Sequence, residues 1–317
     1  MFFEAFKITG TAVAQTFLLA AIGYFLVRRN LLGDACLNTI SGLVIDVTLP
    51  LMIFTKLLSQ FSFSAYPHWW VFPLFSIAIT GFGLFCAKGC LGWVKDPQAK
   101  QQFLSLVGFQ NSGYLPLSLV AAMLSPAKAG EMFIYIFLFL LGFNLAMFSL
   151  GIYIISTAHN KKFEAKSLFN PPVIATLVSL ALIALGWGKA IPGFVLKPIE
   201  MMGDCTLPLA LLVVGGNIAQ IKLKNTNIKE IALMSFIKLV LMPALGMAFV
   251  LRLNLTPLVG LLIILQLTMP PATTLSLLVR RYGKDDLLVS QGIFYAHIIS
   301  IITIPLFTSL YFVLVPR

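Results

Sequence analysis

Apolar runs of about 20 residues recur from one end of the chain to the other, with short polar stretches between them. An α-helix rises 1.5 Å per residue, so a run of this length crosses the roughly 30 Å hydrocarbon core of a bilayer. The pattern predicts ten membrane-spanning helices with soft boundaries: 8–27, 37–58, 68–93, 102–124, 131–158, 171–187, 197–220, 228–251, 257–279 and 289–315. We expect the first span to be structural, because a signal peptide shows one short apolar block followed by a soluble sequence.

Composition supports lipid as the main solvent of this chain. Of its 317 residues, 59% are hydrophobic and 10% are charged, and the mean hydropathy is +0.96. Soluble domains are about half apolar and a quarter charged, so a water-soluble fold could not hide this much apolar surface. The longest connection, 159–170, is too short for a separate domain. The predicted fold class is therefore an all-α, multi-pass membrane protein.

Basic residues are unevenly divided between the two sides of the predicted spans. Fourteen lie after odd-numbered spans: Arg28, Arg29, Lys88, Lys95, Lys100, Lys161, Lys162, Lys166, Lys222, Lys224, Lys229, Arg280, Arg281 and Lys284. Seven lie on the other side: Lys7, Lys56, Lys128, Lys189, Lys197, Arg252 and Arg317. Because Lys and Arg near span ends are retained in the cytoplasm, we expect a plasma (inner) membrane protein with both termini outside. This distribution also explains most of the net charge of +11, so no nucleic-acid partner is expected.

An internal repeat divides the chain in two. The string Asp-x-Thr-Leu-Pro-Leu occurs at 46–51 and again at 204–209, an offset of 158 residues. The same offset places Leu-Ser-Leu at 117–119 on Leu-Ser-Leu at 275–277. Each half, 1–158 and 159–317, would hold five spans, and an odd number makes consecutive halves insert in opposite orientations. The prediction is an inverted-topology repeat, an architecture common among secondary transporters.

Two predicted spans carry helix breakers in matching places. The fourth holds Gln-Asn-Ser-Gly-Tyr-Leu-Pro at 110–116, and the ninth holds Thr-Met-Pro-Pro-Ala-Thr-Thr at 268–274. Proline lacks a backbone donor and clashes with the preceding turn, so both helices should be interrupted. Each interruption creates a half-helix N-terminus, whose free amides and positive dipole end suit an anion. The crossing of the two breaks is thus a candidate carboxylate site, although transmembrane prolines often only kink a helix.

Ionisable residues inside predicted spans are the next candidates, because a charge in lipid is costly. Lys238 could pair with an aspartate, compensate a helix break or attract an anion. Asp46 and Asp204 could shape helix breaks or couple transport to protons or sodium. His297 could titrate near neutral pH or face a neighbouring helix. No metal site is expected from the four cysteines, which lack the company of other ligands: Cys36, Cys86, Cys90 and Cys205.

These motifs together resemble the auxin efflux carrier superfamily, which includes plant PIN-FORMED auxin carriers and bacterial malate permease-like proteins. The resemblance covers essentially the whole chain. It rests on Asn-x-Gly-x-x-Pro at Asn111, Gly113 and Pro116, on Lys238 followed by Leu-Met-Pro, on Met269-Pro270-Pro271-Ala272, and on the two Asp-x-Thr-Leu-Pro strings.

The resemblance implies ten helices in two inverted five-helix repeats with broken crossover helices 4 and 9, a fold related to bile-acid symporters and sodium/proton antiporters. Helices 1, 2, 6 and 7 would form a dimerising scaffold, and helices 3–5 and 8–10 a transport domain that moves as an elevator. The family's first crossover asparagine corresponds to Asn111, whereas Pro270 and Pro271 replace the second. That departure argues against auxin itself as the substrate, and the lack of the long cytoplasmic loop of many plant members favours a small bacterial-type carrier.

The predicted function is secondary transport of a small organic anion, a malate-like or auxin-like carboxylate, by a homodimer without a cofactor. No phosphate-binding loop or catalytic constellation is evident, so neither ATP use nor enzyme activity is expected. The alternatives are a sodium- or proton-coupled symporter and a non-transporting membrane sensor. The candidate substrate-binding residues are Asn111, Ser112, Gly113, Pro116, Thr268, Pro270, Pro271, Thr273, Thr274 and Lys238, and the candidate coupling or structural residues are Asp46, Asp204 and His297.

Overall fold

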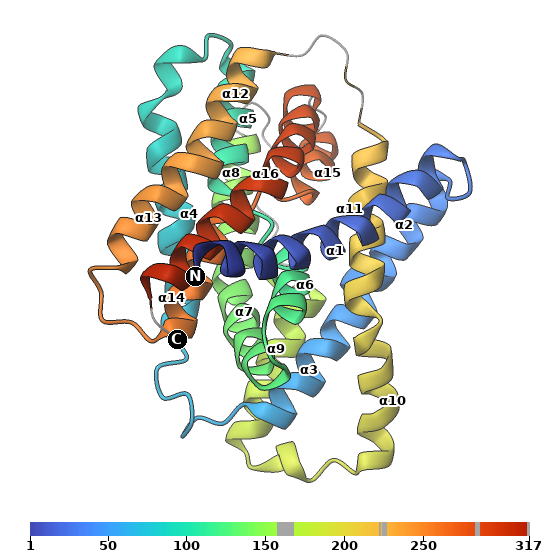
Figure 1. The fold of residues 1–317 in the computed structure, drawn as a ribbon. Helices are drawn as coiled ribbons and strands as arrows, with labels where there is room; N and C mark the ends of the chain where they lie inside the picture. The colour runs from blue at the N-terminus through green and yellow to red at the C-terminus, as the bar shows by residue number, and fades with distance from the viewer. Residues whose placement is uncertain (157–167, 222, 224–226, 283–285, 316–317) are drawn as a thin grey trace.

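The regular structure of the described chain is entirely helical (Figure 1). The computed structural model describes residues 1–317 except 157–167, 222, 224–226, 283–285 and 316–317. The predicted boundary between the halves at 158 and 159 lies outside the described residues, as do Lys161, Lys162, Lys166, Lys222, Lys224, Lys284 and Arg317. The prediction of an all-α fold is confirmed.

Seven segments of the described chain are long and apolar enough to cross a membrane. They are Phe2–Arg28, Asp34–Gln60, Val71–Gly89, Pro126–Ile155, Gly193–Ala219, Ile228–Val250 and Leu287–Leu314. The other three predicted spans contain shorter apolar helices: Tyr114–Met123, Pro171–Ala184 and Pro257–Thr268. The membrane class is therefore supported, and the ten-span inverted layout stays a prediction.

In the first half, the helices follow the predicted spans. They are α1 (Phe2–Arg28), α2 (Asp34–Leu43), α3 (Leu49–Gln60), α4 (Val71–Gly89), α5 (Pro97–Gly108), α6 (Tyr114–Met123), α7 (Pro126–Ala146) and α8 (Ile152–Ser156). A π-helical turn, η1 (Val44–Thr48), joins α2 to α3, another, η3 (Met147–Gly151), joins α7 to α8, and a short 3₁₀ turn, η2 (Leu91–Trp93), follows α4. Local chemistry fixes the start of α5, where the Asp96 side chain accepts a bond from the Ala99 amide at 2.6 Å and Pro97 takes the first helical position.

The described part of the second half is also helical. Its helices are α9 (Pro171–Ala184), α10 (Gly193–Asp204), α11 (Thr206–Ala219), α12 (Ile228–Phe236), α13 (Met242–Val250), α14 (Pro257–Thr268), α15 (Thr274–Arg281) and α16 (Leu287–Leu314). A 3₁₀ turn, η5 (Trp187–Lys189), follows α9, and a π-helical turn, η6 (Ile237–Leu241), joins α12 to α13. Both η1 and η6 end just before a proline, Pro50 or Pro243, whose missing amide and bulky ring make a wider turn favourable.

Close backbone packing joins the first and second halves of the chain, where α1 crosses α11 (Figure 1). A Cβ atom on Gly215 would lie 1.7 Å from the Ala20 carbonyl oxygen, and one on Gly23 would lie 2.1 Å from the Leu212 carbonyl oxygen. Only glycine permits such an approach, and small residues at helix crossings are the usual means of tight packing in lipid.

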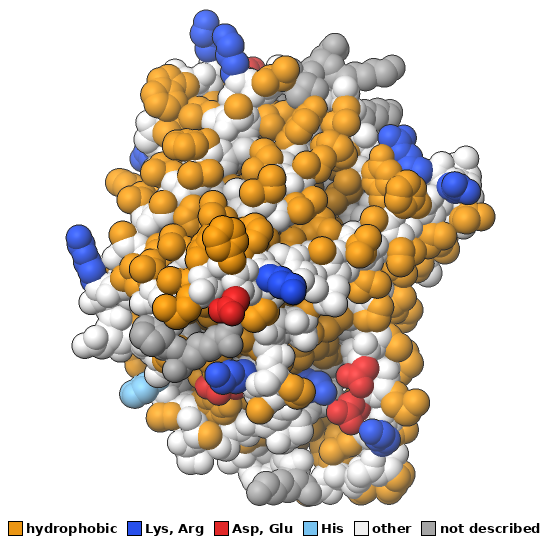
Figure 2. All heavy atoms as spheres, viewed as in Figure 1, with side chains coloured by type: hydrophobic (Ala, Val, Ile, Leu, Met, Phe, Trp, Pro, Cys, Tyr) orange, Lys and Arg blue, Asp and Glu red, His pale blue; other side chains and the backbone are white. Residues whose placement is uncertain are grey.

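Large apolar side chains remain exposed over the outside of the bundle, as Figure 2 shows for one face. Phe85, Phe194 and Ile302 are each more than two thirds exposed. By contrast, the core holds fully buried aromatic residues of α5, α7 and the segment after α5, among them Phe103, Phe109 and Phe137. An apolar exterior around an apolar core is what a bilayer solvent requires.

Candidate anion-binding site

The two predicted helix breaks cross each other. The amide of Asn111 donates to the Pro270 carbonyl at 2.8 Å, and the amide of Ala272 donates to the Phe109 carbonyl at 3.0 Å. These bonds form an antiparallel bridge between Gln110 and Pro271. In Figure 1, α5 and α15 lie in the upper half of the molecule and α6 and α14 in the lower half, so the breaks meet near its middle.

Local sequence explains why the chain is extended here. A residue before proline is pushed towards extended backbone, and Met269, which precedes Pro270, has φ −69° and ψ 138°. The Gln266 side chain, near the end of α14, donates from Nε2 to the Ser112 carbonyl at 3.1 Å. This bond ties α14 to the opposite break and supports the crossing.

A cavity of about 370 Å³ lies beside the crossing. Both half-helix N-termini border it: Gly113 and Tyr114 at the start of α6, and Thr273 and Thr274 at the start of α15. The first amides of a helix have no partner within the helix, and the aligned peptide dipoles place positive charge there. The cavity therefore has two adjacent sources of positive potential.

One face of α15 runs along the cavity. Thr274, Leu277, Leu278 and Arg281 all line it, a spacing of i, i+3, i+4 and i+7 that places them on one side of a helix. Arg281 is the one charged side chain among the described residues of the lining, and none of these residues is acidic. The charge of the described lining therefore favours an anion.

Amide side chains supply the polar part of the wall. Asn111 is 5% exposed, and its Nδ2 is buried with no hydrogen-bond partner among the described residues. Elsewhere in the lining, Asn170 donates from Nδ2 to Asn144 Oδ1 at 3.1 Å, and Asn144 donates from Nδ2 to the Leu140 carbonyl at 2.8 Å. Buried amide donors are normally paired, so the unpaired Asn111 group is a candidate ligand contact.

The structure brings five of the ten predicted substrate-binding residues to the cavity wall: Asn111, Ser112, Gly113, Thr273 and Thr274. The others lie behind it. Pro270 and Pro271 form the crossing itself, Pro116 is buried in the first turn of α6, and the Thr268 hydroxyl donates to its own helix at the Leu265 carbonyl, at 2.8 Å.

Lys238 lies in η6, fully buried behind the crossing and not on the cavity wall. Its Nζ donates to the Val107 carbonyl at 3.0 Å and to Gln110 Oε1 at 3.5 Å. The described residues provide no carboxylate within ion-pair distance of this amine. Its first contacts are therefore with the protein's own oxygens.

Of the three candidate coupling or structural residues, Asp204 and His297 lie away from the cavity and Asp46 lies next to it. Asp204 is exposed and 3.9 Å from Lys56, which also contacts Glu200 at 3.3 Å. Asp46 is exposed in η1, between two residues that line the cavity. His297 is buried in α16 with Nδ1 2.8 Å from the Ile293 carbonyl oxygen, and it does not line the cavity.

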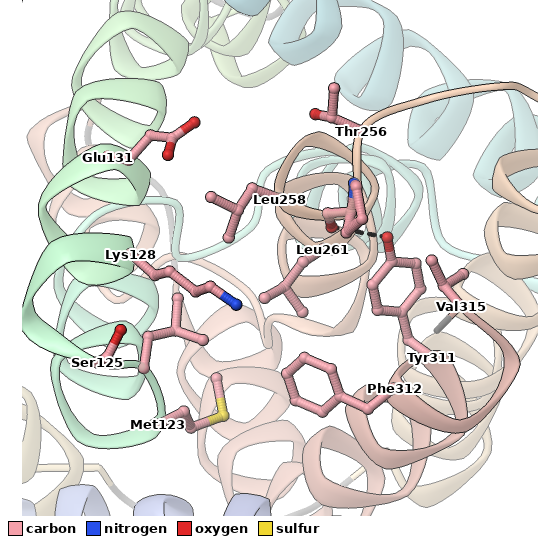
Figure 3. Close-up of a pocket in the computed structure, with 12 residues that line it drawn as sticks. Met123, Ser125, Lys128, Glu131, Thr256, Leu258, Leu261, Tyr311, Phe312 and Val315 are labelled. Carbon is pink, nitrogen blue, oxygen red and sulfur yellow. Dashed lines mark hydrogen bonds between the residues drawn. The ribbon is translucent and has the colours of Figure 1, made fainter. Parts of the chain in front are cut away.

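A second cavity, of about 390 Å³, lies at the opposite ends of some of the same helices (Figure 3). Its lining includes Met123 at the end of α6, Lys128 near the start of α7 and Leu258 near the start of α14. Figure 3 shows the Lys128 amine pointing into this space, and the Tyr311 hydroxyl donates to the Pro257 carbonyl at its edge, at 2.7 Å. Both α6 and α7 thus border both cavities. Helix α14 borders the second cavity, and the break that follows α14 borders the first.

Sequence reasoning missed several cavity residues. The sequence pattern indicates Arg281 only as a loop charge, and it does not distinguish Tyr114, Asn144 or Asn170 as cavity residues. A signal for Arg281 existed in its spacing, since it lies seven residues after Thr274 and so two turns along the same face. No comparable signal links Asn144 to Asn170, which are 26 residues apart.

Comparison with known proteins places the chain in a family. A family sequence model described as "Membrane transport protein" matches residues 8–159 and 155–308, which together cover nearly the whole chain. A search of curated proteins finds no significant match. The chain therefore belongs to the membrane transport protein family of auxin efflux and PIN-like carriers, as its sequence motifs predicted.

Proposed function

We propose that the protein is a secondary transporter of small organic anions and that it binds a carboxylate in the cavity beside the crossing. The observation that carries this proposal is the charge of that cavity. Two half-helix N-termini and Arg281 border it, and none of its described lining residues is acidic. Helix N-termini bind carboxylates through free amides and the helix dipole, and a guanidinium adds a bidentate contact.

Each part of the lining has a role in this proposal. Asn111 Nδ2 and the hydroxyls of Thr273 and Thr274 would donate hydrogen bonds to the bound carboxylate. Apolar side chains, including Leu140 and Phe143, would pack against the hydrocarbon part of the substrate. A mixed lining of this kind suits an amphiphilic acid more than an inorganic ion.

The two cavities support alternating access. Along α7, Glu131 lines one and Leu140 lines the other, so about 14 Å of helix separates them at 1.5 Å per residue. In the orientation expected from the basic residues, the Arg281 end of the crossing cavity faces the cytoplasm and the second cavity faces outward. A substrate bound at the crossing would meet one side at a time.

The origin of the lining supports an elevator movement. Ile45, Leu49 and Pro172 belong to the expected scaffold helices, and Asn170 directly precedes one of them. The other described lining residues belong to the expected transport helices, except Arg281, which follows the ninth expected span. A site between two bodies changes its exposure when one slides along the other. We extend the proposal to two inverted repeats and a scaffold-mediated homodimer, supported by the repeated strings at 46–51 and 204–209.

Cation-coupled symport is the second candidate, and Asp46 is the observation that favours it. This carboxylate lies in a π-helical turn next to the cavity and has no ion-pair partner among the described residues, whereas Asp204 is paired with Lys56. Uptake measured with and without imposed proton and sodium gradients separates the two mechanisms. Coupling through Asp46 predicts that Asp46→Asn abolishes the response to a gradient.

The test of transport uses proteoliposomes and two labelled acids, L-malate and indole-3-acetate, as probes of the dicarboxylate and aromatic monocarboxylate classes. We expect saturable uptake of one class above that of protein-free liposomes, and a fall of at least tenfold in Arg281→Gln. The matched control is Arg280→Gln, because Arg280 is the neighbouring arginine on the same helix and does not line the cavity. Binding without uptake would favour a sensor, and equal uptake by the two variants would remove Arg281 from the site.

A further inference from the structure

The Lys238 amine contacts a backbone carbonyl oxygen and a side-chain amide oxygen at the C-terminal end of a half-helix. Val107, whose carbonyl oxygen it contacts at 3.0 Å, is in the last turn of α5. The last four carbonyls of a helix have no partner within the helix, and the dipole places negative charge at this end. The second contact, at 3.5 Å, is Gln110 Oε1, in the break that follows.

These are the features of a cation site in a broken-helix transporter. Unwound backbone carbonyls and half-helix C-termini are what coordinate sodium in such carriers. Here a primary ammonium group takes that place, fully buried, with oxygens as its contacts and without a carboxylate in ion-pair distance among the described residues. A lone buried ammonium needs compensation, and the end of α5 provides it.

Packing around Val107 leaves little space for an additional ion. A Cβ atom on Gly83 of α4 would lie 2.9 Å from the Val107 carbonyl oxygen and 3.1 Å from Met242 Cε. The backbone of α4 therefore packs closely against the carbonyl that Lys238 contacts, and the Met242 side chain lies close to the same glycine. The ammonium also holds Gln110, which forms the bridge with Pro271, so its position bears on the geometry of the crossing.

We propose that Lys238 is a positioning residue whose ammonium group permanently fills a cation site at the crossing, in place of a dissociable sodium ion. It neutralises the end of α5 and fixes Gln110, so the crossing keeps its form without sodium. The consequence for coupling, that transport needs no sodium at this position, rests on the proposed transport function. The occupancy itself does not, because it can be tested without a substrate.

The experiment measures the melting temperature of the purified full chain in detergent at constant ionic strength. Wild-type protein should melt at the same temperature in sodium chloride and in choline chloride. Lys238→Ala leaves a space that n-propylammonium, the missing fragment of the side chain, can fill, so this ion should raise the melting temperature of the variant by about 5 °C. Tetramethylammonium, which has no N–H donor, should not.

Two further variants separate occupancy from packing. Lys238→Met fills the space without charge and should show no response to propylammonium. Lys128→Ala, which alters a lysine exposed at the other cavity, should behave as wild type in every salt. Lack of any response of Lys238→Ala to propylammonium or sodium would overturn the proposal. If Lys238→Ala is unfolded in every salt, the test uses the wild-type protein alone. A higher melting temperature of the wild type in sodium chloride than in choline chloride would overturn the proposal, and equal melting temperatures would support it.

Discussion

Replacing Asn111 with alanine should lower the affinity for a carboxylate and leave the stability of the ligand-free protein nearly unchanged. The backbone N–H of Asn111 donates to the Pro270 carbonyl and so holds the crossing together. A substitution of the side chain keeps this backbone bond. The side chain is 5% exposed, and its Nδ2 has no partner among the described residues. Its removal therefore deletes a buried, unpaired donor from the ligand-free protein.

The expected magnitudes follow from that environment. An unpaired buried donor costs about 1–3 kcal/mol, which the substitution recovers, while the small space left behind costs a similar amount. The free energy of unfolding should then change by less than about 1 kcal/mol. A hydrogen bond to a charged group is worth about 1.5–3 kcal/mol, so the affinity for the carboxylate should fall roughly 10- to 150-fold.

Two measurements check this separation. Calorimetric titration gives the affinity of each protein for its best carboxylate, and thermal unfolding without ligand gives the stability. Asn254→Ala, at an exposed asparagine between α13 and α14, is the matched control and should change neither quantity. The reasoning would be refuted by an Asn111→Ala protein with wild-type affinity, or by one that loses more than about 3 kcal/mol of stability without any ligand.

Three other substitutions test the packing and the charges. Gly215→Ala should lower the melting temperature by several degrees, because the added Cβ would lie 1.7 Å from the Ala20 carbonyl oxygen and overpacking costs about 1–3 kcal/mol. The control Gly81→Ala should not lower it, since a Cβ there meets nothing within 4 Å. Asp204→Asn should change the free energy of unfolding by less than about 1 kcal/mol, because its partner is 3.9 Å away and the carboxylate is exposed. Thr273→Val should weaken carboxylate binding about tenfold in titration without lowering stability, since the hydroxyl lies at the α15 N-terminus on the cavity wall.

Much of the crossing could be predicted from sequence because its causes are local. Pro270 and Pro271 lack donors, and Gly113 and Asn111 are poor helix formers, so both interruptions follow from single residues. The matching positions of the two interruptions in the repeat indicated that they would meet. The structure supports this with the bonds between Asn111 and Pro270 and between Ala272 and Phe109.

The rest of the site depends on which way each helix face points in the folded protein. The face of Arg281 is fixed by where α15 restarts, and only the structure sets that start at Thr274. Lys238 is a similar case, because sequence cannot distinguish a buried lysine that faces an acid from one that faces a carbonyl. Its contact with Val107 joins residues 131 positions apart, across two helices whose packing no local pattern encodes.

The most direct test is a thermal-shift titration of the purified wild-type protein against a panel of monocarboxylates and dicarboxylates, with the uncharged amides of the same acids as controls. A ligand of the folded state raises stability in proportion to RT ln(1 + [L]/Kd). If the crossing cavity binds a carboxylate, at least one acid should raise the melting temperature in this way and its amide should not. The same shift in Asn111→Ala should need roughly 10- to 150-fold more acid. A shift of equal size for an acid and its amide, or one with the wild-type concentration dependence in both Asn111→Ala and Arg281→Gln, would contradict a carboxylate site at the crossing.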